Sequence, residues 1–252
     1  MTHTPPLKTS AAPAWDGLPM PRRLWAIVAV AFGVSLSVID GAIANVALPT
    51  IGRELGISEA DSIWIVNAYQ LAIMVSLLSF SALGDVVGYR KIYLGGLALF
   101  TLASVGCACS YSFATLVLTR VLQGFGAAAV TSVNTTLIRN IYPRAQLGRG
   151  MGINATVVAV SAVAGPTLAA AILSVASWPW LFAVNIPVGV TAFVLSRRYL
   201  PQNPVLVRDH RFDWRDGVLN ALTFGLLIAS IEGFSHGLDP RLIAFGVAAL
   251  LL

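Results

Sequence analysis

The long stretches without charge limit the choice of fold more than any other feature of this sequence. Between Leu24 and Leu48 the only formal charge is Asp40. A helix needs roughly 20 apolar residues to cross the hydrocarbon layer of a bilayer. Of the 252 residues, 57% are hydrophobic and 11% charged, whereas soluble domains average about 25% charged. We therefore expect an all-α membrane protein, because each helix satisfies its own backbone hydrogen bonds in lipid.

Apolar runs of spanning length recur along the chain. We predict spans at 24–48, 62–83, 92–110, 113–138, 151–176, 180–196 and 217–235, with an eighth beginning near Leu242 and reaching only part of the way to a full span. This divides the chain into a disordered, proline-rich cytoplasmic tail (1–23), a six-helix bundle (24–196), a cytoplasmic connection (197–216), and a seventh helix with a partial eighth (217–252). An inverted three-plus-three arrangement is compatible with the six-helix block, although no clear repeat shows in the sequence.

The positive charges indicate how the chain is oriented. Of the 16 Lys and Arg residues, 13 fall in the N-terminal tail and in the connections on its side of the predicted membrane. Only Arg53 and Arg241 fall on the other side. The bias predicts a multi-pass protein of the cytoplasmic membrane with its N-terminus in the cytoplasm. It also explains the net charge of +5 without nucleic acid as a partner.

Two full charges, Asp40 and Arg120, lie inside predicted spans. At about 1.5 Å per residue, both sit about 10–12 Å below the same membrane face, so we expect them to meet. Charges at this depth are costly and usually mark a pathway or relay. Two interpretations stay open. The pair is either a static structural contact, or Asp40 is a protonatable carboxylate influenced by the permanently charged Arg120.

Uncharged polar residues also lie at membrane depth. Each one can be explained by hydrogen bonding between helices, but as a set they predict a wet interior cavity that receives a small-molecule substrate. The predicted cavity residues are Asn45, Asn67, Tyr69, Gln70, Gln123 and Asn134. Small residues in the fourth span, including Gly124 and Gly126, predict close helix contacts. Gly165–Pro166 predicts a bend in the fifth span, because proline removes a backbone donor.

The sequence offers little for an enzyme. Its three histidines, His3, His210 and His236, fall in the tail or in connections, without partners that would make a catalytic or metal-binding cluster. We interpret Cys107 and Cys109 as small buried residues, because a spacing of two turns them to different faces of a helix. We therefore expect neither enzymatic activity, nor a cofactor, nor a metal.

One short connection has an unusual composition. "ALGDVVGYRKIYLGG", residues 82–96, combines Asp85, Arg90 and Lys91 with four glycines between two apolar runs. Its first part, with Ser81, resembles the signature G-x-x-x-D-x-x-G-R-[KR] between the second and third helices of the major facilitator superfamily, with Asp85, Gly88 and Arg90 matching. We expect the glycines to permit a sharp turn and a close helix approach.

Five further stretches, in order, resemble the 14-helix drug–proton antiporter branch of that superfamily. They are "VIDGAIANVALPTI" around Asp40, "LTRVLQGFGAAA" around Arg120, "AVAGPTLAAAI" around Gly165–Pro166, "WPWLFAVNIPVG", and "FDWRDG". The resemblance covers about residues 24–233. It identifies the bundle as the N-terminal half of a major-facilitator-type transporter, with the C-terminal half of the same transporter as its missing partner.

The resemblance implies a function and residue roles. It implies proton-coupled efflux of small, amphipathic or cationic compounds, with Asp40 and Arg120 in proton coupling. It also implies that Asp85, Gly88, Arg90 and Lys91 form a conformational latch, a contact with the other half that holds one conformation. A plain topology anchor and tight turn is the alternative for this loop. The alternatives for the whole chain are an exporter of another metabolite and a truncated fragment that does not transport.

Overall fold

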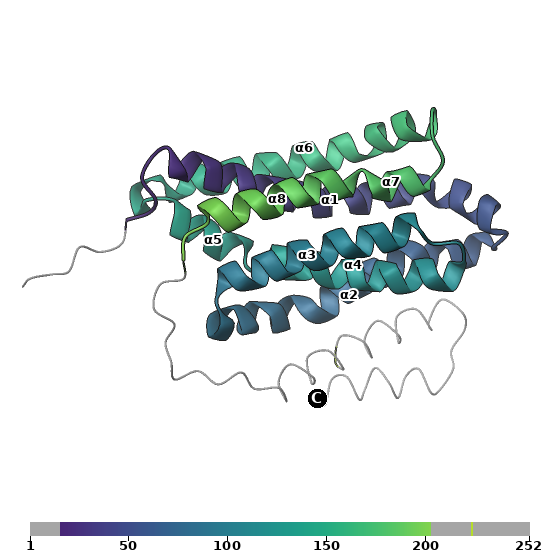
Figure 1. Ribbon diagram of the computed structural model, residues 1–252, viewed down its shortest axis with the longest axis horizontal. Coiled ribbons are helices and arrows are strands. Elements are labelled where there is room, and N and C mark those ends of the chain that lie inside the picture. The colour runs from purple at the N-terminus through teal and green to yellow at the C-terminus, as the bar shows by residue number, and fades with distance from the viewer. Residues whose placement is uncertain (1–15, 203–222, 224–252) are drawn as a thin grey trace, which may run out of the picture.

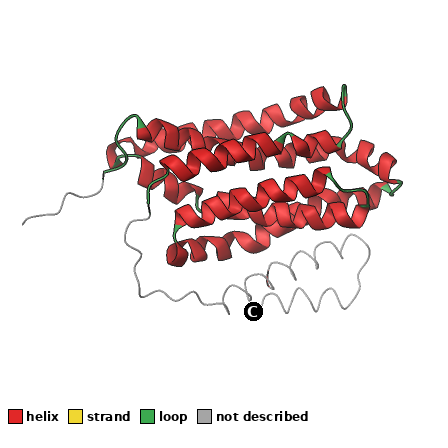
Figure 2. Cartoon of the chain, viewed as in Figure 1, coloured by secondary structure: helices red, strands yellow, loops and turns green. Residues whose placement is uncertain are grey.

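The structure is a computed structural model that describes residues 16–202 and Thr223. Within them it contains six helical stretches long and apolar enough to cross a membrane (Figure 1). The elements are α1 (Arg22–Leu55), α2 (Glu59–Val87), α3 (Tyr89–Ala108), α4 (Phe113–Ser132), α5 (Asn134–Ile141), the short 3-10 helix η1 (Arg144–Gln146), α6 (Leu147–Leu173), α7 (Pro179–Ala183) and α8 (Asn185–Tyr199). The fold class is the predicted all-α one, and Figure 2 shows helices joined by short loops.

The first six predicted spans correspond to these helices, but most of the helices are longer than predicted. The first runs to Leu55 rather than Leu48, past Pro49, and ends where Gly56 adopts a φ of 64°. The predictions counted apolar residues, whereas helical hydrogen bonding continues through polar residues beyond the hydrocarbon layer. The fourth span combines α4 and α5, and the sixth combines α7 and α8. The predicted seventh and eighth spans lie outside the described residues.

The end of the predicted tail is ordered, which corrects its boundary. Leu18 is 1% exposed, and its backbone N–H donates to the carbonyl of Ile141 at 2.9 Å. The Asp16 carboxylate accepts from the backbone N–H of Arg144 at 3.0 Å. Proline content alone predicted no structure here, but Leu18 gains a buried site against the α5–η1 connection.

The helices form two layers, and each layer contains helices from both the first three spans and the last three spans of the bundle. α1 packs mainly against α6 and α8, while α4 packs mainly against α2 and α3. Figure 1 shows α1, α6 and α8 on one side and α2, α3 and α4 on the other. The first span of each three-span set therefore packs on the last two spans of the other set, which is compatible with a three-plus-three organisation.

Small residues make the contacts of α4 close. A Cβ atom at Gly126 would lie 2.6 Å from the backbone nitrogen of Phe100, and one at Gly124 would lie 2.6 Å from the carbonyl oxygen of Tyr69. Gly96 on α3 meets Gly126 in the same way, because its Cβ would lie 2.8 Å from the Gly126 carbonyl oxygen. The structure thus confirms the close helix contacts predicted at Gly124 and Gly126.

The connection between α2 and α3 is a single residue, Gly88, rather than the predicted 83–92 segment. Its φ of 109° is one that residues with a Cβ rarely adopt. Gly84 supports the close approach, because a Cβ there would lie 3.0 Å from both Tyr89 and Val133 side chains. Gly95 does not, since a Cβ there meets nothing within 4 Å. Three of the four glycines therefore serve the turn and the packing.

Candidate functional site

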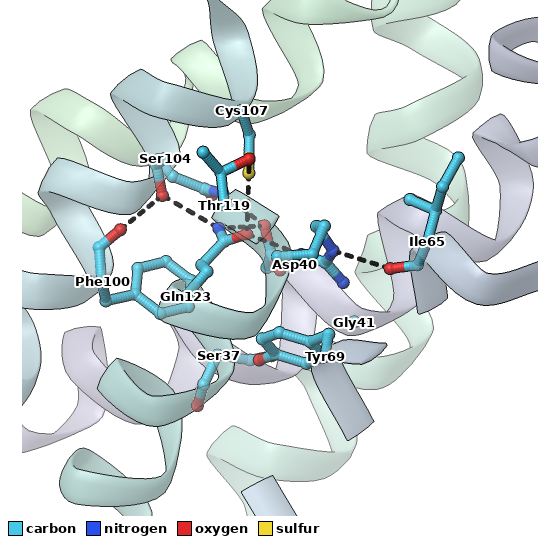
Figure 3. Close-up of polar contacts among 12 residues, drawn as sticks. Ser37, Asp40, Gly41, Ile65, Tyr69, Phe100, Ser104, Cys107, Thr119 and Gln123 are labelled. Atoms are coloured by element: carbon cyan, nitrogen blue, oxygen red, sulfur yellow. Dashed lines mark hydrogen bonds and ion pairs between the residues drawn. The ribbon is translucent and has the colours of Figure 1, made fainter. Parts of the chain in front are cut away.

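A buried polar layer separates two apolar clusters in the bundle. One cluster includes Leu36 and Phe100, and the other includes Ile43 and Leu116. Between them lie five polar side chains that are at most 3% exposed: Asp40, Ser104, Arg120, Gln123 and Asn185. They come from α1, α3, α4 and α8, so this layer joins members of both helix layers (Figure 3). Burial of polar groups at this depth requires that they bond to one another.

Asp40 accepts three side-chain hydrogen bonds. Its Oδ2 lies 2.5 Å from Nη1 of Arg120. Its Oδ1 accepts from Nε2 of Gln123 at 2.8 Å and from Nδ2 of Asn185 at 2.6 Å. The structure thus brings Asp40 and Arg120 together, as the depths predicted, and fully removes both from the surface.

Arg120 is held by more than the carboxylate. Its Nε donates to the carbonyl of Ile65 at 3.1 Å, and its Nη1 also donates to Oε1 of Gln123 at 2.7 Å. The guanidinium carbon lies 4.1 Å from the centre of the Tyr69 ring and 5.6 Å from that of Phe182. Nη2 has no hydrogen-bond partner within the described residues. Aromatic faces stabilise a desolvated guanidinium by roughly 2 kcal/mol or more.

Gln123 extends the layer to α3. Its Nε2 donates to Oγ of Ser104 at 2.9 Å, and Oγ of Ser104 donates to the Phe100 carbonyl at 2.8 Å. The thiol of Cys107 lies 3.4 Å from Oε1 of Gln123. Cys107 is buried as predicted, but Cys109 is exposed, because α3 ends at Ala108 and leaves Cys109 at its C-cap.

A polar cavity of about 370 Å³ lies next to Tyr69, the residue whose ring contacts Arg120. Its lining residues come from α1, α2 and α4: Ser37, Val38, Gly41, Ala42, Asn45, Tyr69, Gln70, Ile73 and Thr131. The Tyr69 hydroxyl donates to the Ser37 carbonyl at 3.0 Å, and the same ring contacts the Arg120 guanidinium. Asp40 itself is sealed from this cavity, because its side chain is 0% exposed.

Three of the six predicted cavity residues line this space, namely Asn45, Tyr69 and Gln70. Gln123 belongs to the buried polar layer instead. Asn134 lies at the start of α5, where its Nδ2 donates to Oδ1 of Asn154 on α6 at 3.1 Å. Asn67 is half-buried on α2. Polarity at membrane depth thus marked cavity-lining residues and residues that bond between helices alike, and the contacts separate the two.

The three charged residues at the α2–α3 connection differ in exposure and in contacts. Asp85 is exposed in the last turn of α2 and accepts a hydrogen bond from the Tyr89 hydroxyl. Arg90 is half-buried and donates to the carbonyl of Arg197 near the end of α8. Lys91 is exposed. Arg90 therefore ties this turn to the last helix of the bundle, while Asp85 and Lys91 remain accessible.

Gly165 and Pro166 lie within α6, which is continuous across them. A Cβ at Gly165 would lie 2.5 Å from the Cβ of Ala42, so this glycine allows α6 to approach α1 closely. The bend predicted at this position stays a prediction. Among the described residues, no group of three or more His, Cys, Asp or Glu side chains could hold a metal ion.

Asn185 and Ser104 are polar-layer residues that the sequence did not single out. Asn185 lies in the stretch "WPWLFAVNIPVG", at the start of α8, and Ser104 lies four residues before the end of α3 at Ala108. Asparagine at membrane depth was a usable signal, but serine was not, because serine commonly bonds to its own helix. Contact with Asp40 makes Asn185 part of the candidate site.

A helical membrane bundle with a buried charge pair next to a polar cavity is typical of transport proteins. The family model of the Major Facilitator Superfamily matches residues 30–251. The chain therefore belongs to the major facilitator superfamily, which is a family of multi-pass membrane transport proteins and not of enzymes.

Relatives and a solved structure agree with this membership. The uncharacterized transporter YebQ of Escherichia coli is 56% identical over 237 residues, covering 94% of this chain and 52% of YebQ. An MdtD protein of Salmonella typhi, named for multidrug resistance, is 35% identical over 233 residues, covering 90% and 49%. The riboflavin transporter RibZ of Clostridioides difficile is 34% identical over 192 residues, covering 76% and 42%. The chain spans about half the length of these relatives.

The fold is that of a bacterial homologue of the human lysosomal transporter Spinster, whose crystal structure is inward-facing and unoccupied. The two chains superpose with a TM-score of 0.61 at 18% sequence identity, covering 92% of this chain and 56% of that chain. At this identity the likeness concerns the fold alone.

Proposed function

We propose that this chain is the N-terminal portion of a proton-coupled efflux transporter of the 14-helix drug–proton antiporter branch, in the cytoplasmic membrane with its N-terminus in the cytoplasm. The observation that carries the proposal is the Asp40–Arg120 pair, buried beside a polar cavity and separated from it by Tyr69. The similarity to MdtD, named for multidrug resistance, supports the efflux function.

The pair connects proton binding to a change of conformation. Protonation of Asp40 removes the negative charge that compensates Arg120. An uncompensated guanidinium cannot remain in a dry layer without cost, since breaking a buried ion pair destabilises by about 3–5 kcal/mol. Because Asp40 is sealed from the polar cavity, a proton reaches it only when the helices around it separate. Proton binding is thus tied to opening of the polar layer, which is what a coupled transporter requires.

Substrate would bind at the polar cavity, where Asn45 and Gln70 offer amide groups and Tyr69 contacts Arg120 on its opposite side. Movement of the Tyr69 ring upon binding would expose the pair. The C-terminal half of the transporter would close this cavity, and the two halves would rock around the substrate. The turn at Gly88, with Asp85 exposed and Arg90 anchored to α8, would form the latch against that half.

A second candidate function is export of a neutral metabolite on the same fold. The described lining of the polar cavity contains no charged residue, so it holds no anchor for a cationic drug. The similarity to the riboflavin transporter RibZ also favours this candidate. In both candidates the coupling role of Asp40 is the same.

The test uses a transporter with both halves, reconstituted into vesicles, in which substrate-induced proton release is measured with a pH-sensitive dye. Lipophilic cations and neutral aromatic compounds are compared as inducers, in the parent and in Asp40→Asn. Proton release by cations in the parent alone supports drug antiport. Release by neutral compounds alone supports metabolite export, and equal release in the two proteins contradicts the coupling role of Asp40.

A further inference from the structure

A second cavity, of about 560 Å³, lies between α1, α6 and α8. It is bounded by α1 from Val28 to Ile43, by α6 from Thr156 to Ile172, and by the start of α8 around Val188. Figure 1 shows α6 and α8 next to α1, and both helices pack on α1 but scarcely on each other. The cavity between them is a groove with α1 as its floor. We call it the α1–α6–α8 groove.

The residues that line this groove do not require a polar ligand. It contains no charged residue, and each of its four polar side chains already has a partner. Ser161 bonds to Ser35 across the floor at 2.9 Å, and Thr156 donates to a carbonyl of its own helix at 3.0 Å. Asn185 donates to Asp40 at 2.6 Å. A hydrocarbon occupant would therefore leave no buried polar group unsatisfied.

The groove opens at membrane depth over an apolar rim. Phe32, Val160 and Leu168 on this rim are 39%, 62% and 43% exposed. The 15 residue steps from Val28 to Ile43 make the groove about 22 Å long at 1.5 Å per residue. Dividing 560 Å³ by that length gives a mean cross-section of about 25 Å². This shape suits one extended hydrocarbon chain better than a compact ring system.

We propose that the α1–α6–α8 groove binds one acyl chain of a membrane lipid, extended along α1. Hydrophobic transfer contributes nothing, since the chain comes from hydrocarbon. The gain is packing, because walls on three sides provide more close contacts than neighbouring fluid lipid chains do. Asn185 forms part of the wall and bonds to Asp40, so a bound chain also keeps water away from the back of the polar layer.

Photolabelling tests this proposal without any transport assay. The 252-residue chain is placed in phosphatidylcholine vesicles containing phosphatidylcholine with a diazirine in the middle of one acyl chain. Mass spectrometry then compares labelling of two α6 residues, Ala164 in the groove and Ala162, which is exposed and lies outside it. Illumination is repeated after excess detergent has replaced the bulk lipid. We expect label at Ala164 to persist while label at Ala162 falls about tenfold, as about 1.4 kcal/mol of preferential binding would produce.

Two other outcomes overturn the proposal. Equal loss at both positions means that the groove holds only ordinary exchanging lipid. No label at Ala164 in vesicles means that protein covers the groove. A matched pair of variants adds a second readout, in which Ala164→Phe fills the groove and Ala162→Phe adds the same bulk on the exposed face of α6. Label retained at Val157 should fall about tenfold in the first and stay unchanged in the second. If Ala164→Phe does not insert, the measurement on the parent decides alone.

Discussion

Arg120 contacts Asp40 at 2.5 Å although 80 residues separate them, and neither side chain has any exposed area. Each side chain neutralises the charge of the other. Replacing one of them alone therefore leaves the other as a buried charge without its partner.

Asp40→Asn is expected to abolish substrate-induced proton release in a transporter with both halves. It should also lower stability by about 3–5 kcal/mol, since Arg120 loses its counter-charge. The double variant Asp40→Asn with Arg120→Leu removes both charges and serves as the control. It should recover most of the stability, measured by thermal unfolding in detergent, but no coupling. Coupling in either variant would show that the pair is only structural.

Arg120→Lys keeps the charge but loses the planar fork that binds Asp40, Gln123 and the Ile65 carbonyl at once. We expect export to continue with a changed pH dependence, because a lysine ammonium cannot make these contacts with one planar group. The measurement is the initial export rate across a pH series. An unchanged profile would contradict a role for the guanidinium in coupling.

Asn185→Ala removes one of the three donors to Asp40. Loss of a buried hydrogen bond to a charged group should cost about 1.5–3 kcal/mol of stability. The pH profile of proton release should change as well, because Asp40 loses one of its hydrogen-bond partners. Val190→Ala on the same helix, where Val190 is 50% exposed, is the control and should leave the profile in place.

Asp85→Asn is expected to change the balance between inward-facing and outward-facing states without changing topology. Its carboxylate is exposed and accepts a hydrogen bond from the Tyr89 hydroxyl, one turn further along the chain. Labelling of single cysteines from each side of the membrane reports the balance. Identical labelling in Asp85→Asn and its parent would leave the turn and topology anchor as the only role of this residue.

Gly126→Ala and Gly95→Ala make a matched pair, because both place a methyl group on a membrane helix. At Gly126 the new Cβ would lie 2.6 Å from the Phe100 backbone, whereas at Gly95 it meets nothing within 4 Å. We expect Gly126→Ala to lower the melting temperature and Gly95→Ala to raise stability by about 0.5–1 kcal/mol. Similar melting temperatures for the two variants would contradict the close α3–α4 contact.

The sequence alone determined the class of fold and six of its helices, because the cost of placing polar backbone and charge in hydrocarbon acts locally on every run of residues. The same reasoning found Asp40 and Arg120, since a charge at membrane depth is conspicuous without any neighbour. Helix ends were less accurate, and the single-residue connection at Gly88 was missed, because hydrogen bonding continues through polar residues that a hydropathy count excludes.

Only the tertiary structure decided what each polar residue contacts. Asn45, Gln123 and Asn134 look alike in sequence, yet one lines a cavity, one bonds to Asp40, and one joins α5 to α6. Asn45 donates to Gly41 on its own helix and Asn134 bonds to the α-helix that follows α5, whereas the partner of Gln123 lies 83 residues away on α1. Asn185 likewise reaches Asp40 across 145 residues. Local chemistry determined which residues need a partner, and the packing of the helices on one another determined which partner each one has.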